Sequence, residues 1–233
     1  MKVPITLPSR ELQYIKNINK KINQELKKGI YIGGDNVKIF EENIKNFLNT
    51  KYVVTLNSGT DALSLSLLAL GIKEGDEVLV PSFTFFASVE CIYHVGAKPV
   101  FVDIDINTYC IDLNDLKKKI TKKTAAIIPV HLFGNNGNLN ELIEISKQYN
   151  IKIVEDAAQS FGSKLSSKKY LGTIGDLGAF SFYPSKTLGG IGDGGMIATN
   201  NRNYFNLLTK LKNHGQSKNY EHKIVGTNSR LDA

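Results

Sequence analysis

Short apolar segments rich in Val, Ile and Phe recur along the chain, separated by polar stretches. Their length and β-branched content predict buried strands at residues 51–56, 77–81, 98–103, 124–130, 151–156, 178–182 and 195–199. Apolar residues with helical spacing lie between several of these segments, as in 61–71, which ends at Gly71, and in 141–150. Residues 9–28 and 36–49 predict two further amphipathic helices before the first strand.

Strands and helices alternate in this pattern. The alternation favours an α/β fold with a mostly parallel sheet and helices on both faces. In such a sheet, ligands bind beyond the carboxyl ends of the strands. The residues that follow each predicted strand are therefore the first candidates for chemistry, and they are residues 57–60, 82–86, 131, 156–159 and 183–186.

The sequence Asn-Ser-Gly-Thr-Asp at 57–61 joins a predicted strand to a predicted helix. Ser58 with Asp61 three positions later forms a capping-box pattern, which is a purely structural interpretation. The same geometry suits phosphate binding, because helix N-terminal amides bind anions, Gly59 permits close approach and Thr60 adds a hydroxyl donor. This segment alone does not separate the two interpretations.

Two adjacent carboxylates, Glu155 and Asp156, end the predicted strand 151–156. A carboxylate at this position either caps the next turn or holds a cation or a protonated ring nitrogen. Lys186 lies in a loop with Pro184, Ser185 and a run of glycines. It is either a surface lysine or an amine in a loop whose backbone approaches a ligand or another chain.

Several other motifs carry weaker signals. Residues 190–195 match G-x-G-x-x-G, but the match precedes a strand-like segment instead of opening a helix, so we exclude a dinucleotide fingerprint. Cys91 and His94 lack the further ligands that a metal site needs, and we expect no metal. His131 is a candidate pocket residue or a satisfied structural histidine. Among Phe83, Phe85 and Phe86, which we expect to be partly core, one could stack on a flat ring.

Composition and charge narrow the class of protein. The chain has 233 residues, 42% of them hydrophobic. It contains no apolar run near the ~20 residues of a membrane span. The first ten residues lack the apolar stretch of a signal peptide, and two cysteines make no disulfide framework, so we expect a cytoplasmic protein and no membrane partner.

The net charge of +7 comes from 29 basic residues, only three of which are arginine. The lysines are spread along the chain and not clustered, which is typical of solvated helix faces and does not favour nucleic-acid binding. An alternative is a surface that attracts an acidic substrate, such as a phosphorylated one. The total charge does not distinguish these alternatives.

Taken together, the candidate sites suggest a single ligand. A phosphate seat, an acid for a ring nitrogen, an aromatic face and a lysine able to form a Schiff base are the four features that pyridoxal phosphate requires. The inference rests on the expected co-location of these residues at one edge of the sheet.

The chain resembles the sugar aminotransferases of the DegT/DnrJ/EryC1/StrS family, which have the type I fold of pyridoxal-phosphate enzymes. The resemblance begins near Tyr31 and lies in the stretches YIGG, NSGTDAL, GDEVLVPSFTFFAS, GAKPVFVDID, IIPVHLFG, VEDAAQSFGS, FSFYPSKTLGGIGDGG and NHGQSKNYEHKIVGTNSRLDA. These stretches occur in the order found in the family.

The resemblance implies a role for individual residues. It makes Lys186 the Schiff-base lysine, Asp156 the acid that pairs with the pyridinium nitrogen, and Gln159 a neighbour of the ring and its 3-hydroxyl. Its other implied cofactor contacts are the phosphate-binding Gly59, Thr60 and Ser181, the ring-stacking Phe85, and Asn228, which reaches the cofactor phosphate of a partner subunit. The last role implies a homodimer with shared active sites. His131 and Tyr183 are candidate substrate contacts.

The resemblance also implies an organisation. We expect a helical N-terminal segment at 1–30 and the cofactor-binding large domain at 31–233. Family members continue into a small C-terminal domain, so we expect this chain to be truncated where a helix begins at 230–233.

The implied activity is amino transfer from L-glutamate to a nucleotide-linked keto sugar. The stretches NHGQSKNYEH and NSRLD are most similar to members that aminate a 3-keto hexose on dTDP or UDP. A 4-keto sugar, a cyclic polyol ketone and a non-catalytic regulatory role remain as alternatives. Relatives that remove a sugar hydroxyl carry histidine at the lysine position, and Lys186 argues against that branch.

Overall fold

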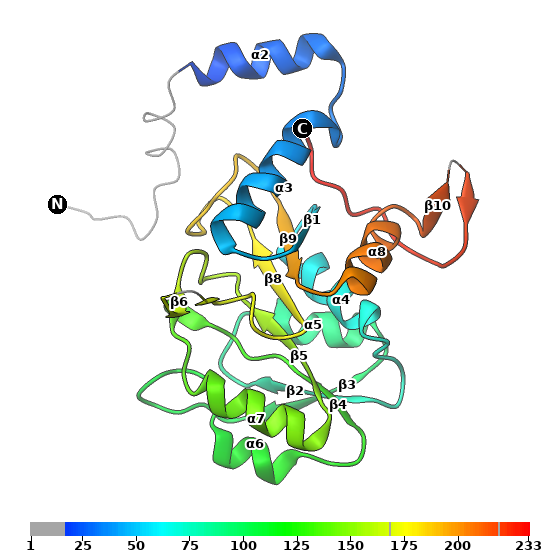
Figure 1. Cartoon of the computed structure of the whole chain (residues 1–233). Coiled ribbons are helices and arrows are strands. Elements are labelled where there is room, and N and C mark those ends of the chain that lie inside the picture. Colours follow the sequence, from blue (N-terminus) through cyan, green and yellow to red (C-terminus); the bar gives the residue numbers. More distant parts are fainter. Residues whose placement is uncertain (1–16, 168, 219) are drawn as a thin grey trace, which may run out of the picture.

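A computed structural model describes residues 17–167, 169–218 and 220–233. Its centre is a seven-stranded sheet with the order β1-β9-β8-β5-β4-β2-β3 (Figure 1). The strands are β1 (Tyr52–Leu56), β2 (Glu77–Pro81), β3 (Lys98–Val102), β4 (Thr124–Ile127), β5 (Lys152–Asp156), β8 (Leu177–Ser181) and β9 (Gly195–Thr199). The helices are α2 (Ile18–Lys28), α3 (Gly34–Leu48), α4 (Gly59–Ala69), α5 (Ala87–His94), α6 (Leu113–Lys119), α7 (Leu139–Tyr149) and α8 (Arg202–Leu211).

The sheet is mostly parallel, as the alternation of elements predicts. β2 pairs in parallel with β3 and β4, β4 with β5, and β5 with β8. β9 is the exception, because it runs antiparallel to both of its neighbours, β8 and β1. A short apolar segment has the same composition in either direction, so the sequence pattern does not reveal the reversal.

Alternate side chains of each central strand enter different cores. Val54, Val78, Val80 and Val154 point to the core under α4, α5 and α8. On the other face, residues such as Leu79, Ile127 and Ile153 pack against α6 and α7. A third cluster joins α3 to the same face of β1, β8 and β9. The period-two alternation thus buries both faces of the sheet.

Helices were predicted near both ends of the chain, and the structure contains a helix near the N-terminal end but none at 230–233. Residues 18–28 form α2, which has no buried residue among its eleven, and residues 9–16 lie outside the described residues. Figure 1 shows α2 apart from the sheet and the C-terminus beside α3. The prediction of a helix at 230–233 is wrong, because Asp232 pairs with Ile32 in an antiparallel bridge and the Ala233 amide donates to the Tyr31 carbonyl at 2.9 Å.

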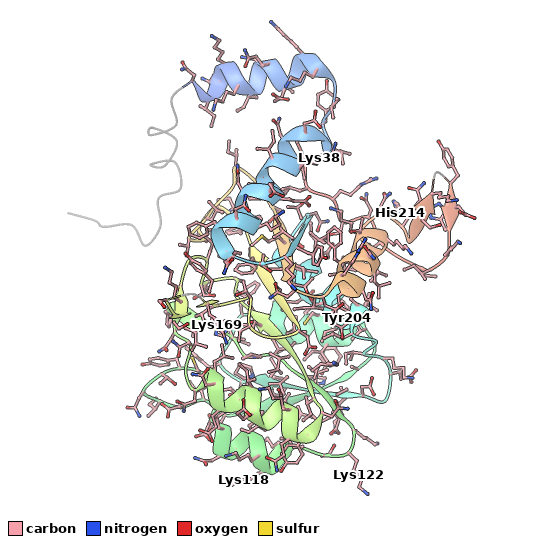
Figure 2. The ribbon with its side chains drawn as sticks, viewed as in Figure 1. Lys38, Lys118, Lys122, Lys169, Tyr204 and His214 are labelled. Atoms are coloured by element: carbon pink, nitrogen blue, oxygen red, sulfur yellow. The ribbon has the colours of Figure 1, made fainter. Side chains whose placement is uncertain are left out.

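The described part of the chain also contains a short 3-10 helix, η1 (Leu132–Gly134), and two hairpins outside the main sheet. The hairpins are β6 (Lys164–Ser166) with β7 (Lys169–Tyr170), and β10 (Gln216–Lys218) with β11 (Glu221–His222). No described helix combines the length and the apolar character needed to cross a bilayer. Figure 2 shows Lys38, Lys118 and Lys169 projecting outward from three separate elements, so these lysines form no common patch.

Candidate functional site

A cavity of about 580 Å³ opens beyond the carboxyl ends of β1, β2, β5 and β8. This is the edge at which a parallel sheet binds ligands. Eight of the ten candidate site residues line it, namely Gly59, Thr60, Phe85, Asp156, Gln159, Ser181, Tyr183 and Lys186. His131 and Asn228 are the two that do not.

One end of the cavity is the N-terminus of α4. The Ser58 side chain accepts from the Asp61 amide at 3.1 Å, and the Ser58 carbonyl accepts from the Ala62 amide at 3.1 Å. The amides of Gly59 and Thr60 precede these bonds, so they are the donors that this helix end offers to an anion. The capping and anion-binding interpretations of this segment are therefore compatible.

Gly59 also brings Ser181 to this helix end. A Cβ at position 59 would lie 2.7 Å from Ser181 Cβ, which is closer than any side chain tolerates. Only glycine allows the end of β8 to approach α4 so closely. The Ser181 hydroxyl accepts from the Tyr183 amide at 3.3 Å, and its own proton remains available for a ligand.

Asp156 lies at the carboxyl end of β5 and is 6% exposed. Its Oδ1 accepts from the Ala158 amide at 3.1 Å, and its Oδ2 accepts from Ser88 Oγ at 2.7 Å. Each carboxylate oxygen can accept further bonds, and the residue faces the cavity. A protonated ring nitrogen or another cationic donor could be bound there.

Lys186 is half-buried in the loop that follows β8. Its amide donates to the Tyr183 carbonyl at 2.8 Å, which forms a turn, and the Gly190 amide donates to the Phe182 carbonyl at 2.7 Å. A Cβ at Gly189 would lie 2.5 Å from the Pro184 carbonyl oxygen. Because Gly189 has no side chain, the backbone at 189 can pack directly against that of Pro184. This tight loop holds Lys186 at the cavity.

Gln159 and Phe85 form further parts of the cavity wall. The Gln159 Oε1 accepts from the Phe133 amide at 3.2 Å, which leaves its NH₂ group free to donate to a ligand. Phe133 has a left-handed backbone with φ of 56° and is 75% exposed. Phe85 is 71% exposed and presents an aromatic face at the cavity.

His131 is 1% exposed, and its Nε2 lies 2.8 Å from Glu155 Oε2. The structure therefore places it as a satisfied buried histidine and gives no support to direct substrate contact. Burial alone would raise the pKa of the Glu155 carboxyl. The hydrogen bond and charge of His131, with the amides of Gly175 and Gly172, outweigh burial and hold that pKa below its usual range.

Asn228 is exposed and pairs with Asn213 in an isolated bridge. It lies outside the cavity of its own chain, so its role toward a partner subunit stays a prediction. Cys91 and Cys110 are free and buried, and the His94 ring contacts Ser64 Oγ at 3.2 Å. Within the described residues, no group of three or more His, Cys, Asp or Glu side chains could hold a metal ion.

Sequence reasoning missed two residues of this region. Asp193 lies in the glycine-rich loop and lines the cavity. Ser88 is buried behind the cavity and contacts Asp156. The available signal for Ser88 was its place in the first turn of a helix that follows a strand end, where side chains approach the neighbouring strands.

The fold and the site together define an α/β protein with an anion-binding helix end, a carboxylate and a lysine around one cavity. A model of the DegT/DnrJ/EryC1/StrS aminotransferase family matches residues 13–233, and the chain belongs to this family. The resemblance seen in the sequence motifs is confirmed.

Known proteins agree with this assignment. The UDP-2-acetamido-2-deoxy-3-oxo-D-glucuronate aminotransferase of Pseudomonas aeruginosa is 40% identical over 98% of this chain and 63% of that protein. The crystal structure of S. venezuelae DesV in complex with a ketimine intermediate has a TM-score of 0.95 and 37% identity, over 99% of this chain and 62% of that one. The structure of NtdA from Bacillus subtilis with bound cofactor PMP has a TM-score of 0.92 and 32% identity, over 99% and 53%.

The chain has the large-domain fold of the type I aminotransferases, as expected. It spans less than two thirds of the length of each protein described above.

Proposed function

We propose that this protein is a pyridoxal-phosphate-dependent aminotransferase. It would move an amino group from L-glutamate to a nucleotide-linked keto sugar, with a 3-keto hexose on UDP or dTDP as the favoured acceptor. The observation that carries the proposal is the placement of Lys186, Asp156 and the α4 N-terminus around one cavity. The relative from Pseudomonas aeruginosa, an aminotransferase named for a UDP-linked 3-oxo sugar, supports the choice of acceptor.

The residues of the cavity fit pyridoxal phosphate. The amides of Gly59 and Thr60, with the Ser181 hydroxyl, suit a phosphate dianion at the helix end. Asp156 suits a protonated ring nitrogen, and Phe85 offers a face for the ring. When bound, the cofactor supplies an aldehyde that condenses with amines and a ring that accepts electrons from the substrate carbon. The solved relative with bound PMP supports this choice of cofactor.

Each residue would have a distinct task. The Lys186 amine would bind the cofactor covalently and, once displaced by the amino donor, carry a proton to and from the substrate α-carbon. Asp156 would keep the ring nitrogen protonated, because a nearby negative charge favours the cationic form. Gln159 would donate to a ring substituent through its free NH₂ group. Tyr183, at the cavity wall, remains a candidate substrate contact.

The proposal includes the assembly and location of the protein. We propose a homodimer, in which the exposed Asn228 of one subunit reaches the cofactor phosphate bound by the other. The same proposal places the protein in the cytoplasm, because free cysteines such as Cys91 and Cys110 are typical of a reducing compartment.

Two half-reactions test the activity separately. The protein loaded with pyridoxal phosphate is mixed with L-glutamate alone, and we expect one equivalent of 2-oxoglutarate per site. UDP- and dTDP-linked 3-keto and 4-keto hexoses are then added. The amino group left on the cofactor should be transferred to these sugars, and the transfer should be fastest with a 3-keto sugar. If no 2-oxoglutarate is released, the donor assignment fails. If the 4-keto sugars are aminated faster, the acceptor assignment is wrong.

A further inference from the structure

Ser88 holds the Asp156 carboxylate from behind the cavity. It lies in the first turn of α5, is 0% exposed and donates to Asp156 Oδ2 at 2.7 Å. The second oxygen of Asp156 accepts from the Ala158 amide at 3.1 Å. One donor from α5 and one from the loop after β5 therefore restrict the rotation of this carboxylate.

Thr84 extends this contact to the cavity. Its Oγ1 lies 2.8 Å from Ser88 Oγ, and the residue lines the cavity. A carboxylate oxygen only accepts hydrogen bonds, so the single proton of Ser88 is committed to Asp156. Thr84 must then donate its own proton to Ser88. The hydroxyl protons of Thr84 and Ser88 thus point one after the other toward Asp156.

The sheet explains why α5 reaches Asp156. Val154, two residues earlier in β5, points to the core under α4 and α5, and Asp156 points to the same face. The buried Ser88 therefore approaches Asp156 from the protein interior, while the exposed remainder of the carboxylate faces the cavity. Charge-assisted hydrogen bonds of this kind are stronger than neutral ones.

We propose that Thr84 and Ser88 form a hydroxyl relay that orients the Asp156 carboxylate toward the ring nitrogen of the cofactor. Ser88 is then a positioning residue, because it acts on the cofactor only through Asp156. This inference rests on the proposed function, since it assigns the relay to the ring-nitrogen end of the same site.

The relay predicts an effect that depends on the ring nitrogen, whereas a packing role predicts none. Ser66 provides the matched control, because it is also 0% exposed in a helix of the same core. Its hydroxyl donates to the Ala62 carbonyl of its own helix at 2.6 Å and has no link to Asp156. Ser66→Ala thus removes a buried hydroxyl without disturbing the relay.

The experiment compares the binding of pyridoxal phosphate with that of its 1-deaza analogue, in which the ring nitrogen is replaced by carbon. Dissociation constants come from absorbance titration of the wild type and the Ser88→Ala, Ser66→Ala, Thr84→Val and Thr84→Ser variants. We expect Ser88→Ala to weaken pyridoxal phosphate binding about tenfold and to leave the analogue unchanged. Thr84→Val should show a smaller selective loss, Thr84→Ser should restore binding, and Ser66→Ala should alter neither ligand.

Equal losses for both ligands in Ser88→Ala would indicate packing and overturn the relay. Unchanged binding of pyridoxal phosphate in Ser88→Ala would overturn it as well, while wild-type binding at Lys186 would leave the proposed function intact. If the wild type forms no covalent bond between Lys186 and pyridoxal phosphate, the proposed function itself fails, and the relay fails with it.

Discussion

Glu155 and Asp156 are neighbours in the sequence but leave β5 on opposite faces of the sheet. Glu155 is 0% exposed and accepts from His131 and from the amides of Gly172, Ile174 and Gly175. Asp156 accepts from two donors and faces the cavity. Protein donors therefore occupy the hydrogen-bonding positions of the Glu155 carboxylate, whereas the Asp156 carboxylate can still accept hydrogen bonds from a ligand.

This difference separates stability from function at adjacent positions. A buried carboxylate with four donors joins β5 to the loop 172–175, so its loss should affect folding. A carboxylate at a cavity wall contributes less to folding, and its loss should affect chemistry. Variants of the two residues can therefore test the interpretation of each.

The largest expected effect is that of Asp156→Ala on turnover. In the proposed site, loss of this negative charge would let the ring nitrogen of pyridoxal phosphate lose its proton, and the electron-accepting power of the cofactor would fall. We expect the rate constant of the half-reaction with L-glutamate to decrease by on the order of 10⁴-fold, equivalent to about 5 kcal/mol in activation free energy. Stopped-flow measurement of the half-reaction with L-glutamate gives this value, and wild-type turnover in the variant would refute the role of Asp156.

The same variant should leave the fold nearly intact. The free energy of unfolding, measured with urea, should fall by about 1–2 kcal/mol, because the buried Ser88 hydroxyl loses its acceptor while the Ala158 residue lines the cavity and its amide can bond to water. A large loss of stability would mean that Asp156, like Glu155, is a structural residue.

Glu155→Ala should produce the opposite result. It leaves the buried His131 and the amides of Gly172, Ile174 and Gly175 without their acceptor, so the free energy of unfolding should fall by about 3–5 kcal/mol. The control is Glu141→Ala, which removes an exposed ion pair with Lys117 and should cost at most about 1 kcal/mol. Similar urea midpoints for the two variants would contradict the structural role of Glu155.

The smallest expected effect is on acid stability. The pKa of Glu155 is lower in the folded protein than its unfolded value of about 4.3. The ionised group therefore stabilises the fold above that pH, and this contribution is lost as the pH falls through the folded value. Urea midpoints at several pH values should decline more steeply below about pH 4.3 for the wild type than for Glu155→Gln. Parallel curves would show that another group controls the acid transition.

Much of the fold was predictable, because the burial of helices and strands imposes a periodic pattern of apolar residues on the sequence. The segments 77–81 and 195–199 match β2 and β9 in every residue. The direction of β9 was not predictable, because pairing geometry leaves no trace in a five-residue apolar run. Helix α8 was missed, although Asn201 caps it and its apolar residues recur with helical spacing.

The site was predictable in its residue types and strand-end positions, but not in the direction of each side chain. His131 follows the predicted strand 124–130, and Asp156 ends the predicted strand 151–156, yet His131 turns into the core and bonds to Glu155. Ser88 ends the family stretch GDEVLVPSFTFFAS, but only the three-dimensional structure reveals its contact with Asp156. The proposed role of Asn228 requires a second subunit, so a single chain does not test it.

Identification of the residue that binds pyridoxal phosphate is the decisive test of the proposed site. The protein is mixed with the cofactor, reduced with borohydride, digested, and mapped by mass spectrometry, with Lys186→Ala as the control. We expect a visible absorbance band and a single labelled peptide that carries the cofactor on Lys186, both lost in Lys186→Ala. A folded wild-type protein with no label at Lys186, or with an equal label in Lys186→Ala, would contradict this expectation.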